Sequence, residues 1–249
     1  MESIYETMES IYETVYPVRV INTDLFGLCR PSSVMDFMQE AATEHTVRLG
    51  ISSEDLARKG AIWMLARMRY TLFRPIRGGE VLRVKTWGRP PQGAYVLRDF
   101  ELYVGEERVG EAVSVWVLGD LGHHSLLRAE DILMGETWYV PEHPMVKPGK
   151  IRMPKDLEEA GERRIGYSET DINGHANNTR YADYACDAIR FEEHRGRYVQ
   201  ELQITYSAEC LAGQSIRMQS KSEKNTYYVR GVDKDGKPHF DIRMELAEI

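Results

Sequence analysis

Cysteine is scarce in this chain of 249 residues, which holds only Cys29, Cys186 and Cys210, an odd number at unclustered positions. Such spacing favours neither a disulfide framework nor a zinc site, and a reducing compartment is the simplest setting for it. With 42% hydrophobic residues, a chain of this length can bury a core without crosslinks or metals. We therefore expect a cytoplasmic protein that needs no cofactor.

An excess of basic residues is missing as well, because 32 lysine and arginine residues face 39 aspartate and glutamate residues, for a formal net charge of -7. Nucleic acid is therefore not expected as a partner, since phosphate binding depends on a basic surface. Long apolar runs are also lacking. The best stretches, residues 61–66 and 112–118, have the length of a strand, whereas a membrane-spanning helix needs about 20 apolar residues. No stable membrane association is expected.

The beginning of the chain lacks the basic and apolar regions of a signal peptide and carries Glu2, Glu6 and Glu9 instead. Residues 1–7 recur unchanged as residues 8–14. We interpret this recurrence as a duplicated chain start and assign it no function.

What the sequence does contain is an internal repeat, because residues 23–42 reappear without a gap as residues 170–189. The identical pairs are Thr23/Thr170, Asp24/Asp171, Gly27/Gly174, Asp36/Asp183 and Ala41/Ala188. A repeat at this separation indicates paired domains rather than a solenoid, whose periods are about 20 to 50 residues. Prolines at positions 141, 144, 148 and 154 interrupt the stretch between the copies. We expect an N-terminal domain over residues 1–145, a linker over 146–159 and a C-terminal domain over 160–249.

Each half predicts one amphipathic helix followed by strands. The first helix has Ser33 as its expected N-cap and continues towards Gly50, and the second follows Asn178 or Thr179 as its cap. Alternation with period two then predicts strands at residues 64–72 and 202–206. Further strand-like segments, with turns between neighbours, are placed at residues 81–87, 95–104, 106–118, 215–222, 226–232 and 238–246. Each half is therefore expected to be an α+β unit in which one helix covers a meandering antiparallel sheet.

A group of polar residues precedes the second helix. Asp171, Asn173 and His175 are spaced at i, i+2 and i+4, so in an extended segment their side chains would face the same side. Gly174 can adopt positive φ, and the following helix start offers unpaired N–H groups to a developing oxyanion. A carboxylate, an amide, an imidazole and a helix N-terminus together suit hydrolysis or acyl transfer.

Turn and capping chemistry is the alternative explanation for these residues, because Asp, Asn and Gly are common in turns. The first copy keeps Asp24 and Gly27, which suffice for a turn, but has Phe26, Leu28 and Arg30 at the other polar positions. A turn alone therefore does not explain the asparagine and the histidine of the second copy. The chemistry is expected in the second half only.

The motif D-x-N-G-H-x-N-N at residues 171–178, followed by a tyrosine-bearing helix and the pair Glu209 and Cys210, resembles that of the acyl-ACP thioesterases. The similarity extends over nearly the whole chain. It implies a double hotdog fold, in which each half is a curved antiparallel sheet wrapped around a long helix. It also implies hydrolysis of fatty acyl-ACP in fatty acid biosynthesis, with acyl carrier protein and its phosphopantetheine-linked acyl chain as the partner. Further homodimerisation of the fused pair is left open.

The resemblance implies that Asp171, Asn173, His175 and Glu209 form the site, with Cys210 next to it. In one mechanism the cysteine is a nucleophile in a Cys-His-Asn arrangement. In the other, Glu209 and His175 activate a water molecule, Asp171 orients the network, and Asn173 polarises the thioester carbonyl. We favour water, because a carboxylate in a partly apolar cleft can serve as a general base.

Aligning the strands of the two halves sets Pro75 opposite Glu209 and Ile76 opposite Cys210, so the first half lacks both segments of the site. That half is expected to be a scaffold that also holds the acyl chain. The candidate lining is an apolar set rich in methionine, for which plain core packing is the alternative. The set consists of Met35, Met38, Trp63, Met64 and Met68.

Two other functions stay open at this point. An acyl-CoA thioesterase of the same fold would need the same chemistry at the thioester and would differ only in how the carrier is held. A non-catalytic acyl-binding hotdog protein would need the apolar pocket but would have no use for Glu209 together with Asn173 and His175. Acyl chain length and saturation do not follow from the sequence.

Overall fold

The computed structural model describes residues 10–123, 125–133, 139–140 and 145–249. The first copy of the repeated start, and Pro141 and Pro144 of the predicted boundary, lie outside the described residues. The contacts divide the chain into two compact units. The first comprises Met1–Pro17, Asp36–Met68 and Glu80–Pro148, and the second comprises Val18–Met35, Arg69–Gly79 and Gly149–Ile249. Both copies of the polar motif therefore belong to the second unit.

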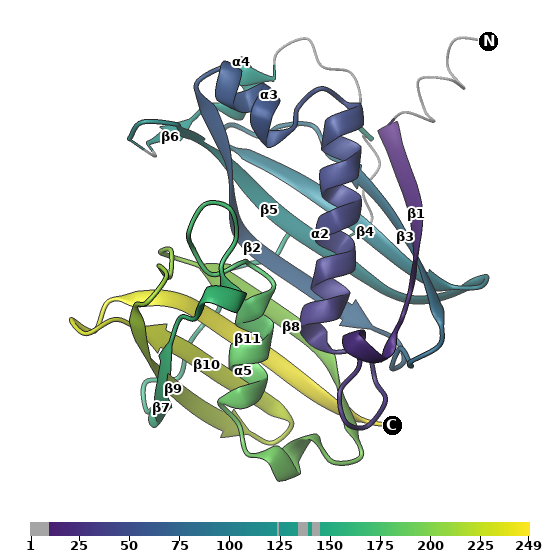
Figure 1. Ribbon diagram of the computed structural model, residues 1–249, viewed down its shortest axis with the longest axis vertical. Coiled ribbons are helices and arrows are strands. Elements are labelled where there is room, and N and C mark those ends of the chain that lie inside the picture. Colours follow the sequence, from purple (N-terminus) through teal and green to yellow (C-terminus); the bar gives the residue numbers. More distant parts are fainter. Residues whose placement is uncertain (1–9, 124, 134–138, 141–144) are drawn as a thin grey trace. The chain divides into compact units, whose positions relative to one another are not determined.

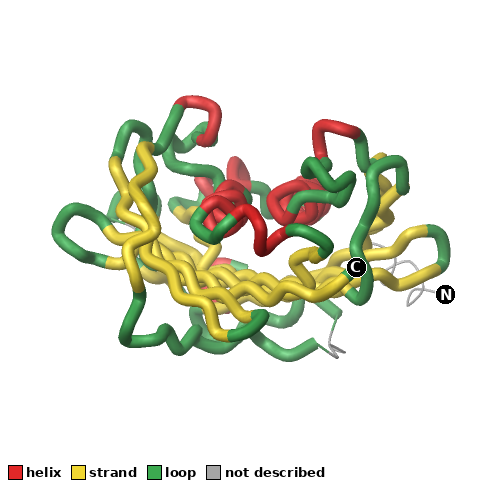
Figure 2. Tube along the Cα trace, turned by 90° about the horizontal axis from the view of Figure 1, so that it is seen from below, coloured by secondary structure: helices red, strands yellow, loops and turns green. Residues whose placement is uncertain are grey.

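The first unit is an antiparallel sheet with a long helix on one face (Figures 1 and 2). Its strands follow the order β1 (Ile11–Pro17), β3 (Val81–Gly88), β4 (Tyr95–Val104), β5 (Glu107–Asp120) and β2 (Ala61–Leu72), with β6 (Leu126–Leu127) beside β5. The helix is α2 (Pro31–Arg48), and the short helices α3 (Ser53–Arg58) and α4 (Ala129–Ile132) border the sheet. Buried apolar side chains between these elements, such as Leu56, Val96 and Leu118, form a core.

The second unit repeats this plan with a shorter helix. Its strands follow the order β8 (Arg197–Tyr206), β11 (Pro238–Glu248), β10 (Thr226–Val232), β9 (Ser215–Glu223) and β7 (Glu158–Arg164). Helix α5 (Arg180–Asp187) buries Tyr181, Ala182, Tyr184 and Ala185. The Tyr181 ring packs edge-on against Phe240 of β11, which attaches the helix to the sheet. The 3-10 turns are η1 (Val20–Asn22), η2 (Tyr167–Glu169) and η3 (Phe191–His194).

Both predicted helices exist, but the first begins earlier than predicted. Helix α2 begins at Pro31, so Ser33 lies inside it and is not the N-cap. Proline suits the first helical position, because the N–H that it lacks would have no partner within the helix there. Helix α5 ends at Asp187, with Ala188 as its C-cap.

The predicted strands are confirmed, with two identical to β4 and β10, and the structure adds two long strands that the pattern did not show. Strand β1 lies at the edge of its sheet and pairs with β3, although residues 11–14 belong to the recurring start. Strand β7 has the sequence EEAGERR and begins within the predicted linker, where it pairs with β9. A charged edge strand lacks the apolar face from which a strand is recognised. The linker's other limits stay predictions.

Within the described ranges, no helix is both long enough and apolar enough to cross a membrane.

Candidate active site

The second polar motif forms a tight turn rather than an extended strand. The Asp171 N–H donates to the His175 carbonyl (2.9 Å), and the Gly174 N–H donates to the Asp171 carbonyl (3.0 Å). Gly174 has φ of +80°, a conformation that favours glycine. The expectation that three side chains share one face of an extended segment is therefore wrong, because the backbone reverses at the glycine.

This turn is hydrogen-bonded to the segment that carries Glu209 and Cys210. The Ala176 N–H donates to the Cys210 carbonyl (2.8 Å), and the Ala212 N–H donates to the Gly174 carbonyl (3.2 Å). These two bonds bring two side chains that are far apart in sequence to one place. His175 Nε2 lies 3.3 Å from Glu209 Oε2.

The histidine and the glutamate are both reachable from solvent. The side chain of His175 is 25% exposed and that of Glu209 is 44% exposed. Glu209 is therefore not enclosed in the partly apolar cleft that we expected. The pair can exchange a proton with a water molecule or a substrate without any rearrangement of the backbone.

Asp171 acts on Asn173 through two hydrogen bonds. One carboxylate oxygen accepts from the Asn173 backbone N–H (2.8 Å), and the other accepts from its side-chain Nδ2 (3.4 Å). The asparagine side chain is otherwise exposed to solvent. It therefore keeps a second amide N–H with which it can donate to a carbonyl oxygen.

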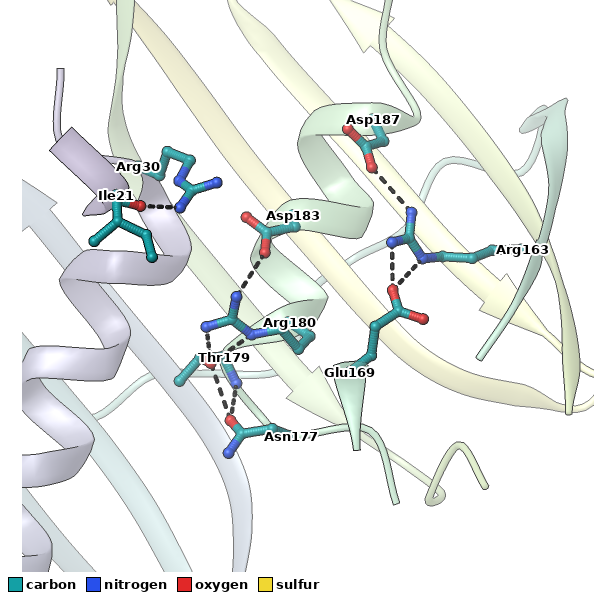
Figure 3. Close-up of polar contacts among 9 residues, drawn as sticks. All are labelled: Ile21, Arg30, Arg163, Glu169, Asn177, Thr179, Arg180, Asp183 and Asp187. Atoms are coloured by element: carbon teal, nitrogen blue, oxygen red, sulfur yellow. Dashed lines mark hydrogen bonds and ion pairs between the residues drawn. The ribbon is translucent and has the colours of Figure 1, made fainter. Parts of the chain in front are cut away.

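Helix α5 has Thr179, one of the two expected residues, as its N-cap. Asn177 holds the turn just before it. Its side-chain oxygen accepts from the Thr179 N–H (2.9 Å), and its carbonyl accepts from the Arg180 N–H (2.9 Å). Figure 3 shows the side-chain contacts of this cap. These N–H groups are occupied, which corrects the expectation that the helix start offers them to an oxyanion.

Cys210 is enclosed, although it is next to Glu209 in the sequence. It is fully buried, and burial raises the pKa of its thiol to about 11. Its backbone N–H donates to the Tyr181 hydroxyl (3.4 Å), and its Sγ lies 3.6 Å from His239 Nδ1. The thiol is therefore neutral at ordinary pH.

His239 is a residue of this region that the sequence analysis missed. Its Nδ1 donates to the Glu209 carbonyl (2.8 Å), and its own carbonyl accepts from the N–H groups of Ser207 (2.8 Å) and Ala208 (3.0 Å). Its Nε2 lies 3.5 Å from the Asp233 carboxylate. One buried histidine thus fastens the segment that carries Glu209. The sequence contains no signal for it, because 30 residues separate the two.

The first copy of the motif has the same backbone without the functional side chains. The Asp24 N–H donates to the Leu28 carbonyl (2.8 Å), and Gly27 has φ of +75°. The Cys29 N–H donates to the Ile76 carbonyl (2.8 Å), as Ala176 does to Cys210. This bond confirms the register that sets Pro75 opposite Glu209. The turn persists while the chemistry differs.

Four of the five candidate acyl-lining residues, all except Met35, belong to the first unit. Met38 and Met68 are buried there, whereas Trp63 and Met64 are partly exposed. Trp63 donates from Nε1 to the Ile51 carbonyl (3.0 Å). Met35 is buried in the second unit. Their role in holding an acyl chain stays a prediction.

Within the described part of the chain, no group of three or more His, Cys, Asp or Glu side chains is arranged to hold a metal ion.

Comparison with known families gives two adjoining matches. Residues 9–134 match the model of the acyl-ACP thioesterase N-terminal domain, and residues 154–245 match that of the acyl-ACP thioesterase C-terminal domain. A chloroplastic acyl-[acyl-carrier-protein] hydrolase of Cuphea viscosissima is 25% identical over 195 residues, which cover 72% of this chain and 47% of that protein. A chloroplastic oleoyl-acyl carrier protein thioesterase of Coriandrum sativum is 22% identical over 218 residues, which cover 80% and 59%. The chain thus spans about half the length of the curated relatives it matches.

Solved structures confirm the double hotdog fold. The crystal structure of an acyl-ACP thioesterase from Bacteroides thetaiotaomicron has a TM-score of 0.89 at 20% identity and covers 97% of this chain and 99% of that one. The 12:0-ACP thioesterase from Umbellularia californica has a TM-score of 0.86 at 17% identity, with 96% and 98% covered. At such identities the likeness concerns the fold.

Proposed function

Because the chain belongs to the acyl-ACP thioesterase family, we propose that it hydrolyses the thioester of a fatty acyl-ACP to free fatty acid and holo-ACP. The observation that carries the proposal is the pair of His175 and Glu209, whose side chains lie 3.3 Å apart and are both partly exposed. The first copy has the same turn but carries Leu28 and Pro75 at these positions.

In the proposed reaction, a water molecule attacks the thioester carbon while Glu209, supported by His175, takes one of its protons. Negative charge develops on the carbonyl oxygen, and this oxygen accepts a hydrogen bond from Asn173 Nδ2, which Asp171 holds in place. The carbon–sulfur bond then breaks, and the departing thiolate of the phosphopantetheine arm takes the proton from the His175 and Glu209 pair and becomes a thiol. The products are a fatty acid and a free thiol.

Water is preferred over Cys210 as the nucleophile because of the environment of the thiol. A thiolate is the nucleophilic form of cysteine, and burial disfavours it by raising the pKa of Cys210 to about 11. The side chain is also fully buried, whereas Glu209 is 44% exposed. We assign Cys210 a packing role under Tyr181 and His239.

His239 is proposed as a positioning residue. Its Nδ1 donates to the Glu209 carbonyl at 2.8 Å, and its own carbonyl accepts from the N–H groups of Ser207 and Ala208, the two residues before Glu209. The side chain of Glu209 has His175 as its ion-pair partner among the described residues, so its placement depends on the backbone that His239 fastens. This contact acts on the reaction through Glu209 and not on the substrate.

The test is hydrolysis of a panel of acyl-ACPs and matched acyl-CoAs by the wild type and by His175→Ala. Free thiol release from acyl-ACP that the variant lacks would support the proposal. His123→Ala is a suitable control, since His123 is an exposed histidine outside the site. Faster release from acyl-CoA would instead indicate a CoA-dependent enzyme of the same fold. Binding of acyl chains without turnover on either panel would contradict an enzymatic role.

A further inference from the structure

A cavity lies within the second unit, against the first copy of the motif, which lacks the functional side chains. Its volume is about 520 Å³. Pockets that bind small ligands have volumes of about 300 to 1,000 Å³. The cavity is lined by the first motif, by the end of β2, and by the segments on either side of η3. All of these belong to one compact unit.

Much of the cavity wall is apolar. Leu28 comes from the motif, Leu72 from β2 and Val199 from β8, and each is buried in the fold while it lines the cavity. Phe26 and Phe191 also line it and stack on each other with ring centroids 6.1 Å apart. Such a wall favours an aliphatic or aromatic ligand body, whose burial removes apolar surface from water.

Arg30 supplies a donor from the motif itself. Its guanidinium donates to the Ile21 carbonyl, and among the residues described its buried Nε has no hydrogen-bond partner (Figure 3). Arg30 occupies the position that corresponds to Asn177, whose side chain accepts from the Thr179 N–H in the second copy. At this position the first copy has a cation that lines the cavity.

The other cations on the wall are already paired. Arg163 donates to Glu169 and to Asp187, which is 2.9 Å away (Figure 3), and Arg197 contacts Glu193 at 3.3 Å. Among the described lining arginines, only Arg30 has no hydrogen bond to a carboxylate.

The acidic residues on the wall have partners as well. Asp187 pairs with Arg163, and Asp183 pairs with Arg180 at 3.2 Å and also feels the charge of Arg30. Asp24 accepts from two backbone N–H groups of its own turn at 2.8 and 3.0 Å. The hydrogen-bonding capacity that the wall leaves unused is therefore that of donors.

We propose that this cavity is a second, non-catalytic site that binds an organic carboxylate with an aliphatic body. The carboxylate accepts hydrogen bonds from the Arg30 guanidinium, and the aliphatic body lies along the wall of Leu28, Leu72 and Val199. A charge-assisted bond from a guanidinium is suited to a carboxylate, which offers two acceptor oxygens.

The test is the affinity of the full chain for dodecanoate, measured by titration calorimetry. Arg30→Met should weaken binding about tenfold or more, since it removes the cation that donates to the ligand. Arg58→Met, which removes an exposed arginine on α3, is the matched control and should bind as the wild type does. No binding of dodecanoate, or equal affinity in wild type and Arg30→Met, would overturn the proposal.

A labelling experiment separates this cavity from the active site without relying on folded variants. A dodecanoate analogue with a photoreactive diazirine at its tail is irradiated with the wild-type chain, and the labelled peptides are sequenced. Labels within residues 24–31, 70–76 or 189–199 are expected. Labels confined to other segments would overturn the proposal, because the ligand would then occupy a different site.

Discussion

Replacing Cys210 by alanine distinguishes the two mechanisms that are open to this site. The pKa of the buried thiol is about 11. At pH 7 the thiolate fraction is therefore about one in ten thousand, because each unit of pH below the pKa lowers it tenfold. If Glu209 activates water, Cys210→Ala should keep most of its turnover. Its stability should fall by about 1 kcal/mol, since one buried atom is removed and a small cavity remains.

The assay is steady-state hydrolysis of acyl-ACP from pH 6 to 10, together with a rapid quench during the first turnover. A thiolate nucleophile would make kcat/KM of the wild type rise about tenfold for each pH unit below the thiol pKa. It would also produce a burst and an acylated Cys210 peptide. Recovery of that peptide, or loss of turnover in a folded Cys210→Ala variant, would refute the water mechanism.

The other predictions concern residues around the same site. Glu209→Gln and His175→Ala should each lower kcat at least about 100-fold, as removal of general acid-base groups usually does, while thermal melting changes little because both side chains are partly exposed; wild-type turnover would contradict the assignment. His239→Ala should lower kcat more than it raises KM, and His239→Asn should restore part of the loss because its amide can donate to the Glu209 carbonyl; a purely structural role would lower stability without changing kcat. Gly174→Ala should destabilise the fold by about 1 kcal/mol in urea unfolding, because φ is +80° there; unchanged stability would contradict the strained turn. Wild-type stability should fall between about pH 9 and 11, because the pKa of Cys210 is raised to about 11 in the folded chain and the unfolded chain loses this proton first; a Cys210→Ala variant with the same alkaline slope would contradict this.

Local patterns account for the parts of the fold that were predicted correctly. Strand-like segments bounded by turns placed β4 and β10 at their observed bounds. In β10 alternate residues are buried, because one side of the strand faces the core. The same reasoning could not find β7, whose charged side chains lie at the edge of the sheet. It also misplaced the start of α2, which begins at Pro31 and not at Val34, the residue after the expected cap Ser33.

The sequence predicted which residues belong to the candidate site but not how they are arranged. The repeat identified Asn173 and His175 by comparison with a copy that lacks them. The shared face that we inferred for them assumed an extended backbone, and the reversal at Gly174 removes that assumption. The spacing of residues along the chain tells which side chains share a face only where the backbone conformation is known.

The sequence by itself therefore determined the duplication, the periodic strands, the polar motif of the second copy and the family that it resembles. These features are patterns of residues along the chain, and they can be read without knowing which remote segments lie together. Only the tertiary structure decided that His175 lies 3.3 Å from Glu209, that Cys210 is buried and that His239 holds the segment that carries Glu209. Distances, burial and pKa values depend on which remote segments pack together, and that packing is a property of the whole fold.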